Sequence, residues 1–456
     1  MVRIDALPED KCFPQLPVVT DVAVMKDLLA RQLPGFAEGE LQINDLTLTD
    51  FQHKPGKRCQ VCYSVQVKDV VTGNEGDQIF LGIVEPNGTA EAQYAKARRE
   101  AHFQPQFGRA VHWLPELSMV LWAFPNEPRL KRLPDLLDEK TLLELLHKHG
   151  ASLSIPFELR LIGIDTQVVK YAPLHRCTLK HRLYFENAVD VIIFSKIYSH
   201  KTDAAALFKI QRSLWNAPVC RSGELIIPEP LFCESVMNVI FQRGINGRNL
   251  DEQLDQLDLE DTAAKIGRAL AGIHQSSLEG LSPRQAEYEL AECADAKAKL
   301  LELNPDYASQ LAGIVTELEK RWPALTPLAP TPIHGAFRLT QVLLVGEKIA
   351  LVDFDGFLLG NPISDVGSFV AYLLYLPYKG LISAAQSRSA IHAFCHAYAE
   401  KAPWGLPADS FAWYTAAYLL GREAKKCLGK STKVSKRDYQ GMIGPLLEMA
   451  KGILDS

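Results

Sequence analysis

One stretch of the chain, from His334 to Asp365, constrains the possible fold more than any other. Residues 342–345 and 349–352 are short apolar segments typical of β-strands, and Gly346 between them suits a tight turn that needs a positive φ. The second segment runs directly into Asp-Phe-Asp-Gly, and carboxylates at the end of a buried strand suit a hard cation such as Mg²⁺. We therefore predict a loop, a β-hairpin, a metal-binding turn and then a helix that opens at Asp365.

This combination resembles the aminoglycoside phosphotransferase and choline kinase family, which has a protein-kinase-like fold. The family pattern is H-G-D-x-x-x-x-N, then a hairpin, an Asp-led metal motif and G-x-P-x-x-D. The positions that match it are His334, Gly335, Asp353, Gly360, Pro362 and Asp365. The resemblance covers about thirty residues, and a hairpin and helix of an unrelated α+β protein is the alternative interpretation.

Two positions of the pattern depart from the family. Ala336 stands where the family has its catalytic Asp, and Gln341 stands where it has a metal-binding Asn. Alanine cannot accept a proton, and general-base help is worth ~10²–10⁴-fold. Phosphoryl transfer depends mainly on positioning and electrostatics, so the loss of the general base need not abolish the reaction. The metal ligands that the resemblance implies are Gln341, Asp353 and Asp355. The other candidate residues of the catalytic loop, beside Ala336, are His334 and Arg338. An arginine in such a loop either binds an anion or is simply solvated.

Composition narrows the class of protein. The chain has 456 residues, which predicts two or three domains. Its net charge of −5 argues against a nucleic-acid-binding surface. No apolar run approaches the roughly 18 residues that span a bilayer. Nine scattered cysteines do not suggest a disulfide framework. We therefore predict a cytoplasmic, reduced protein that binds neither nucleic acid nor membrane.

The front of the chain contains an apparent internal repeat. Residues 53–67 and 171–185 both place Pro three residues before Arg-Cys and continue as strands. Each copy continues with a strand, a helix and two further strands, which is the order of a kinase-like N-lobe. We predict an α+β, protein-kinase-like bilobal fold with a duplicated N-lobe. Its parts are a cap domain at 1–150, an N-lobe at 151–243 and a helical C-lobe at 244–456. A chance likeness of two α+β segments is the alternative.

The two copies differ at the position of the nucleotide-binding lysine. The resemblance implies a lysine on the third strand that reaches the nucleotide phosphates. Lys196 holds this place in the second copy and Gly82 in the first, so only the second copy is expected to cover a nucleotide. The inter-lobe linker that would bind the adenine edge begins with Phe241, Gln242 and Arg243. The alternatives are a solvated lysine and an ordinary turn.

Helical periodicity dominates the rest of the chain. His274, on the helix before the catalytic loop, is expected to be a packed or capping residue. Expected helices span 262–276, one or two segments of 282–321, 366–375, 383–401, 409–427 and 437–454.

Three functions follow from these expectations. The first is an ATP- and Mg²⁺-dependent phosphotransferase that acts on a small hydroxyl or amine compound without the usual base. The second is an inactive pseudokinase that binds a protein or small molecule, with residues 1–150 as partner surface. The third, nucleotide transfer of another kind, has no support beyond the missing base.

Overall fold

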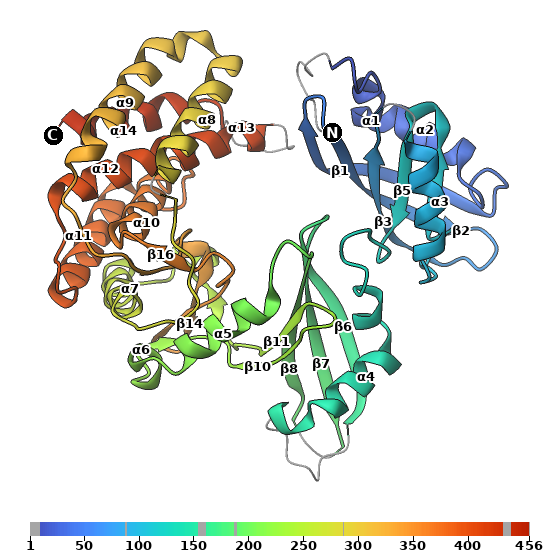
Figure 1. Ribbon diagram of the computed structural model, residues 1–456, viewed down its shortest axis with the longest axis horizontal. Helices are drawn as coiled ribbons and strands as arrows, with labels where there is room; N and C mark the ends of the chain where they lie inside the picture. Colours follow the sequence, from blue (N-terminus) through green and yellow to red (C-terminus); the bar gives the residue numbers. More distant parts are fainter. Residues whose placement is uncertain are drawn as a thin grey trace. The chain divides into compact units, whose positions relative to one another are not determined.

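The computed structural model describes residues 10–86, 89–153, 161–186, 189–285, 287–431 and 439–455 (Figure 1). Two compact units divide the chain. The first unit comprises Met1–Ala205 and Leu231–Phe241, and the second comprises Ala206–Pro230 and Gln242–Ser456. Both predicted N-lobe copies thus lie largely in the first unit. The predicted boundary at 150 stays a prediction, because residues 154–160 lie outside the described part.

The first unit begins with a five-stranded antiparallel sheet in the order β1-β2-β3-β5-β4. Its elements are α1 (Leu16–Thr20), α2 (Val22–Gln32), β1 (Leu41–Lys54), β2 (Arg58–Asp69), β3 (Glu75–Val84), α3 (Ala90–Glu100), β4 (Val111–Leu114) and β5 (Met119–Ala123). Apolar residues alternate along the strands, so the sheet has two apolar faces. One packs on α1 and α2, and the other packs on α3.

A second five-stranded sheet follows, in the order β10-β11-β8-β7-β6. Its strands are β6 (Leu161–Ala172), β7 (Arg176–Phe185), β8 (Val191–Tyr198), β10 (Pro230–Glu234) and β11 (Val239–Arg243), and α4 (Glu139–Lys148) precedes them. The helix that follows β8, α5 (Ala204–Trp215), belongs almost wholly to the second unit. One face packs on α4, whose leucines Leu142, Leu145 and Leu146 are buried in a shared hydrophobic cluster.

The two sheets share one topology. In each, a helix precedes three antiparallel strands, a helix follows the third strand, and a last hairpin pairs with that strand. The strands and helices expected for both copies are confirmed. The common order supports the proposed duplication, which itself remains a prediction.

The strand registers correct one expected equivalence. Gly82 pairs with the residue two positions after Cys59, whereas Lys196 pairs with the residue directly after Cys177. Because successive strand residues face opposite sides of a sheet, Gly82 and Lys196 are not equivalent. The equivalent of Lys196 is Ile83, so the alignment was wrong by one residue. The first copy still lacks a lysine at this place.

A leucine in the β6–β7 turn connects the two sheets of the first unit. Leu174 has a φ of 64° and is only 2% exposed. Its side chain belongs to the hydrophobic cluster on the α3 face of the first sheet, with Leu81 and Trp122. The buried carboxylate of Glu127 accepts the backbone N–H of Leu174. The turn of the second sheet is thus fixed by the first.

The second unit is mainly helical and contains one large hydrophobic core. Its strands are β9 (Leu225–Ile226), β12 (Arg248–Asn249), β13 (Thr331–Ile333), β14 (Val342–Val345), β15 (Lys348–Leu351) and β16 (Leu358–Gly360). Its helices are α6 (Pro218–Arg221), α7 (Leu259–His274), α8 (Tyr288–Leu303), α9 (Ala308–Arg321), α10 (Ile363–Tyr375), α11 (Ala384–Lys401), α12 (Ala408–Tyr418), α13 (Lys425–Ser431) and α14 (Ile443–Asp455). The β14–β15 hairpin confirms the expected one, and Gly346 has a φ of 61°.

Two expectations for these helices were wrong. Helix α10 begins at Ile363, so Asp365 lies in its first turn and does not open it. The expected helix 409–427 is interrupted by a π-helical segment, Leu419–Ala424, between α12 and α13. π-Helical turns place side chains where a regular helix would not, and they are frequent at functional sites.

No helix in the described ranges is both long and apolar enough to cross a membrane.

Candidate active site

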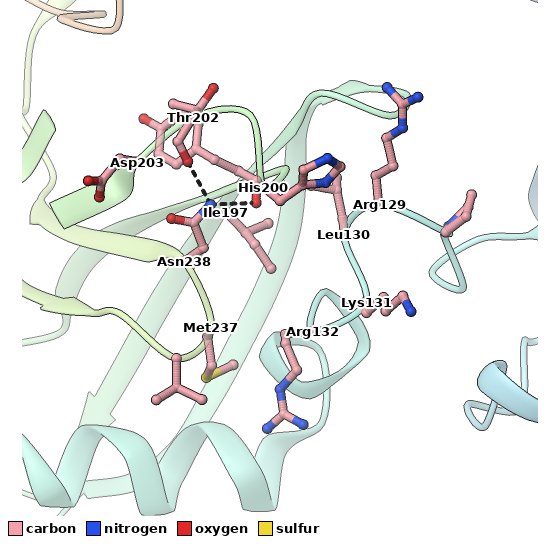
Figure 2. A pocket seen from close by; sticks show the side chains of 13 residues that line it. Arg129, Leu130, Lys131, Arg132, Ile197, His200, Thr202, Asp203, Met237 and Asn238 are labelled. Atoms are coloured by element: carbon pink, nitrogen blue, oxygen red, sulfur yellow. Dashed lines mark hydrogen bonds between the residues drawn. The ribbon is translucent and has the colours of Figure 1, made fainter. Parts of the chain in front are cut away.

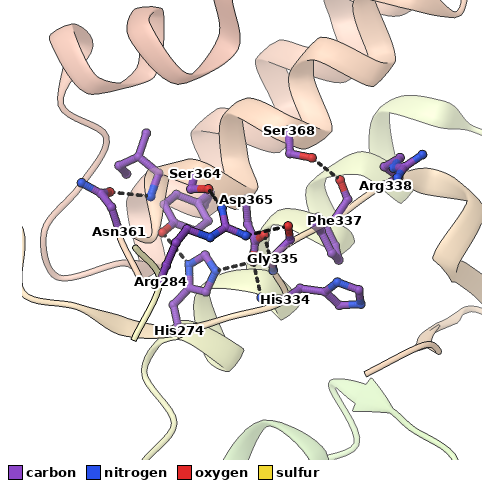
Figure 3. Close-up of polar contacts among 12 residues, drawn as sticks. His274, Arg284, His334, Gly335, Phe337, Arg338, Asn361, Ser364, Asp365 and Ser368 are labelled. Carbon is purple, nitrogen blue, oxygen red and sulfur yellow. Dashed lines mark hydrogen bonds and ion pairs between the residues drawn. The ribbon is translucent and has the colours of Figure 1, made fainter. Parts of the chain in front are cut away.

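A buried carboxylate holds the loop that contains Ala336 (Figure 3). The two oxygens of Asp365 accept the backbone N–H groups of His334 and Gly335, the latter at 3.0 Å. His274 from α7 lies 3.3 Å from Asp365 through Nε2, and its Nδ1 lies 2.9 Å from the hydroxyl of Tyr398. The expectation that His274 is a packed residue is confirmed, since it is 2% exposed.

The electrostatics of Asp365 favour its charged form. Burial by itself would raise the pKa of this carboxyl group. The hydrogen bond with His274, the charges of His274 and His334, and the backbone N–H of His334 act in the other direction, so the pKa is lowered overall. Asp365 is therefore an ionised, fully buried anchor for the loop and lies too deep to be a surface ligand.

A second anchor comes from a residue that the sequence did not single out. Arg284 donates from Nη2 to the carbonyl oxygen of Gly335 at 2.8 Å. Its Nη1 forms an ion pair with Glu289 at 2.5 Å and also donates to Ser364 and Tyr418, each at 3.0 Å. Arg284 lies fifty residues before the motif in a segment without a recognisable pattern, so no signal in the sequence could have identified it.

The loop packs against the predicted metal turn, backbone to backbone. Gly335 has a φ of 78°, and a Cβ at this position would lie 2.5 Å from the carbonyl oxygen of Gly356. Asp353 also has a positive φ, 70°, which is strained for a residue with a side chain. Strained backbone of this kind is typical of functional sites, where the surrounding structure holds it in place.

The three predicted metal ligands lie in this region, and each is half-buried. Among the residues that the structure describes, no cluster of three or more His, Cys, Asp or Glu has the arrangement of a metal site. Mg²⁺ needs only one or two carboxylates beside phosphates and water, so Asp353 and Asp355 fit it chemically. The side-chain oxygen of Gln341 accepts the N–H of Arg338 at 3.0 Å and therefore already supports the loop.

Position 336 has no acid, and the loop residues on either side of it carry no carboxylate. His334 is buried between the rings of Phe337, Phe354 and Phe357, and this burial lowers its pKa. Ala336 is half-buried and has no group that accepts a proton, and the burial of His334 disfavours its protonation.

The residues predicted to bind the nucleotide lie on β8 and at the end of β11. Lys196 is half-buried on β8 in the first unit, so the structure does not test its proximity to Asp353 in the second. The side chain of Phe241 is fully buried and stacks on Phe232. Gln242 accepts a hydrogen bond from Gln211 at 3.0 Å. The remaining linker residue, Arg243, forms an ion pair with Glu229 at 2.6 Å.

An asparagine fixes the loop directly after Lys196 (Figure 2). Asn238, in the β10–β11 turn, donates from Nδ2 to the carbonyl oxygens of Tyr198, Ser199 and Thr202, at 2.8–3.1 Å. Its side-chain oxygen accepts the N–H of Ala204 at 2.9 Å. The end of the strand that carries the predicted lysine is thus closely defined.

A cavity of about 460 Å³ lies beside this turn (Figure 2). It is lined by residues 128–132, the end of β8 and the β10–β11 turn, and basic side chains are prominent. Two of them are already paired, Lys131 with Glu100 and Arg132 with Asp135. The cavity therefore has little excess positive charge.

One segment of the chain, which contains the anchored loop, matches a known protein family. Residues 202–408 match the model of the phosphotransferase enzyme family, APH. The match spans somewhat less than half of the chain, and it includes the linker, the anchored loop, the β14–β15 hairpin and Asp365. It supports the α+β, kinase-like fold expected from the sequence.

Several solved structures show distant similarity. A choline/ethanolamine kinase family protein from Mesorhizobium loti is 16% identical, with 68% of this chain and 94% of that chain covered at a TM-score of 0.41. An ethanolamine kinase from Plasmodium vivax is 12% identical, with 72% and 96% covered at 0.43. A glucosamine kinase in complex with glucosamine, ADP and inorganic phosphate is 12% identical, with 94% and 98% covered at 0.42.

Proposed function

We propose that this protein is an ATP-dependent phosphotransferase that acts on a small hydroxyl or amine compound. The observation that supports this most is the double anchoring of the 334–338 loop by Asp365 and Arg284 against the strained turn at Asp353. This construction lies inside the segment that matches the phosphotransferase family. The positive φ of Asp353 is a strained conformation of the kind that clusters at functional sites, where the surrounding structure holds it in place.

The proposed roles follow the chemistry of the residues. Asp353 and Asp355 would hold Mg²⁺, with Gln341 as a third oxygen donor if its side chain leaves the N–H of Arg338. Bound Mg²⁺ would neutralise phosphate charge. Lys196 would bind the nucleotide phosphates, and the backbone around Phe241, Gln242 and Arg243 would bind the adenine edge.

The first test is a thermal-unfolding titration with ATP, with and without Mg²⁺. A ligand present at a hundred times its dissociation constant stabilises the folded state by ~2.7 kcal/mol, so a bound nucleotide is readily detected. We expect a metal-dependent shift in the wild type that Asp353→Asn reduces strongly. Glu347→Gln, which changes an exposed acid in the turn of the same hairpin, is the matched control and keeps the full shift. No shift with the wild type contradicts the proposal.

The alternative is a protein that binds nucleotide without transferring phosphate. Ala336 favours it, because the described loop has no group that can accept the acceptor's proton. The two functions separate in a single assay of ADP release against a panel of acceptors. A nucleotide-dependent shift without acceptor-dependent ADP release supports the inactive alternative.

A further inference from the structure

We propose that the acceptor is an anion, a hydroxyl compound with its own carboxylate or phosphate, which Arg338 and Arg422 bind beside Ala336. This inference rests on the proposed function and names the substrate class of the same site. The acidic group of the acceptor would replace the charge that Ala336 lacks.

The two arginines converge on the loop from different elements. Arg338, labelled in Figure 3, lies two residues after Ala336, and Tyr372 of α10 acts on its charge. Arg422 comes from the π-helical segment and donates to the hydroxyl of Ser368, which in turn donates to the carbonyl oxygen of Phe337 at 2.8 Å. Two hydrogen bonds therefore connect Arg422 to the residue directly after Ala336.

Basic and acidic side chains meet around this point. Lys426 adds a third cation, and the neighbouring Glu423, which is fully buried, is paired with it at 2.9 Å. The charges of Arg338 and Arg422 both act on Lys426. Burial is the main cause that lowers the pKa of Lys426 to about 8, and the two arginines lower it further. Asp353 is a further carboxylate that acts on Arg338, and we assign it to the metal.

The cluster also contains hydrogen-bonding groups with unused capacity. In the described part of the chain, the buried Nε of Arg338 has no hydrogen-bond partner and is the donor that an anion could use. The buried Oε2 of Glu423 is also without a partner, but a carboxylate oxygen cannot donate to an anion. Buried polar groups in folded proteins are nearly always satisfied, by protein, water or ligand. The guanidinium of Arg422 lies 4.8 Å from the ring centre of Tyr418, which keeps its plane fixed. A planar, oriented guanidinium is suited to a carboxylate or phosphate and would bind a neutral alcohol poorly.

An anionic acceptor also supplies the missing proton acceptor. The hydroxyl oxygen of the acceptor attacks the γ-phosphorus of ATP, and the bond from that phosphorus to the bridging oxygen breaks. The electron pair leaves with ADP. The hydroxyl proton passes to the carboxylate or phosphate of the acceptor itself and then to water. A side-chain carboxylate at position 336 would repel such an acceptor, which gives the alanine a positive role.

Matched pairs of probes test the inference on the full chain. Gluconate and glucitol differ in charge at similar size, as do glucose 6-phosphate and glucose. Binding of each probe is measured by thermal unfolding at constant ionic strength in the presence of ADP and Mg²⁺. In a second assay ATP replaces ADP, and the release of ADP is measured. We expect at least tenfold tighter binding of one anionic probe than of its neutral partner. Preference for gluconate identifies a carboxylate acceptor, and preference for glucose 6-phosphate identifies a phosphate acceptor.

Substitutions assign the preference to the cluster. Arg338→Met and Arg422→Met are each expected to abolish it, while Arg268→Met, at an exposed position of α7, leaves it unchanged. Ala336→Asp is expected to weaken the anionic probe at least tenfold and not the neutral one. Equal binding within both pairs, or a preference that survives Arg338→Met and Arg422→Met, overturns the inference.

The shift in unfolding temperature that the nucleotide causes in the same experiment distinguishes the two proposals. A normal shift with ATP but no charge preference rejects the anionic acceptor alone. A charge preference without any nucleotide shift rejects the phosphotransferase and leaves an anion-binding site.

Discussion

The carboxylate of Asp365 holds the backbone N–H of His334, thirty-one positions earlier in the chain. Because the same carboxylate also accepts from Gly335, the loop cannot shift along its own axis without breaking both hydrogen bonds. The partner on the other side, His274, comes from a third segment. A single buried charge thus fixes the relative positions of α7, the loop and α10.

We expect Asp365→Asn to destabilise the second unit by about 3–5 kcal/mol, the usual cost of breaking a buried charge pair. Because the pKa of Asp365 is lowered in the folded state, its contribution is present above its unfolded pKa near 4 and lost as the pH falls through the folded value. Urea unfolding at several pH values measures both effects. A loss that stays the same at pH 7 and at pH 2 contradicts the assignment of a charged anchor.

A pair of glycines separates steric contact from backbone strain. Gly335 and Gly346 both have a positive φ, so Ala is strained at both positions. Only at 335 would the new Cβ meet other atoms, at 2.5 Å from the carbonyl oxygen of Gly356. Gly335→Ala should therefore cost about 1–3 kcal/mol more than Gly346→Ala, the range typical of overpacking. The difference in free energy of unfolding checks this, and equal losses would show that the loop moves freely away from the turn.

Asn238→Asp tests the fixing of the loop after Lys196. The substitution removes the NH₂ group that donates to three carbonyl oxygens, and a buried group left unsatisfied costs about 1–3 kcal/mol. Unfolding of the first unit should shift by at least that amount. Asn74→Asp, at an exposed position of the same unit, is the control and should have almost no effect.

Glu127 gives the first unit a pH dependence of opposite sign to that of Asp365. Burial raises the pKa of this carboxyl group to about 7, from 4.5. The folded state then binds more protons than the unfolded state between these values, so stability falls as the pH rises from about 4.5 to 7, by ~3 kcal/mol. In Glu127→Gln this slope should disappear. Retention of the slope would assign it to another group.

The sequence predicted the elements that depend on local pattern. The β14–β15 hairpin followed from the apolar segments and Gly346, and the strands of both sheets followed from alternation. It could not predict contacts between distant segments. Arg284 binds Gly335 across fifty-one positions without any local signal, and no local pattern marks the π-helical segment at 419–424.

Two local errors have physical causes. The expected start of α10 at Asp365 relied on the preference of Asp for helix N-termini, but this side chain is used to bind the loop instead. The alignment of Gly82 with Lys196 relied on similar residue types in the two copies. The hairpin register decides which face of the sheet a residue occupies, and it places the two residues on different faces.

Leu174 has a consequence for how this chain can be divided. Its side chain completes a hydrophobic cluster of the preceding sheet, so a protein shortened to begin near residue 151 would present that leucine to water on a strained turn. The hairpin of the second sheet would lose its support even though every one of its own strands remained. The second sheet is therefore stabilised in part by the first, and a stable fragment would need both.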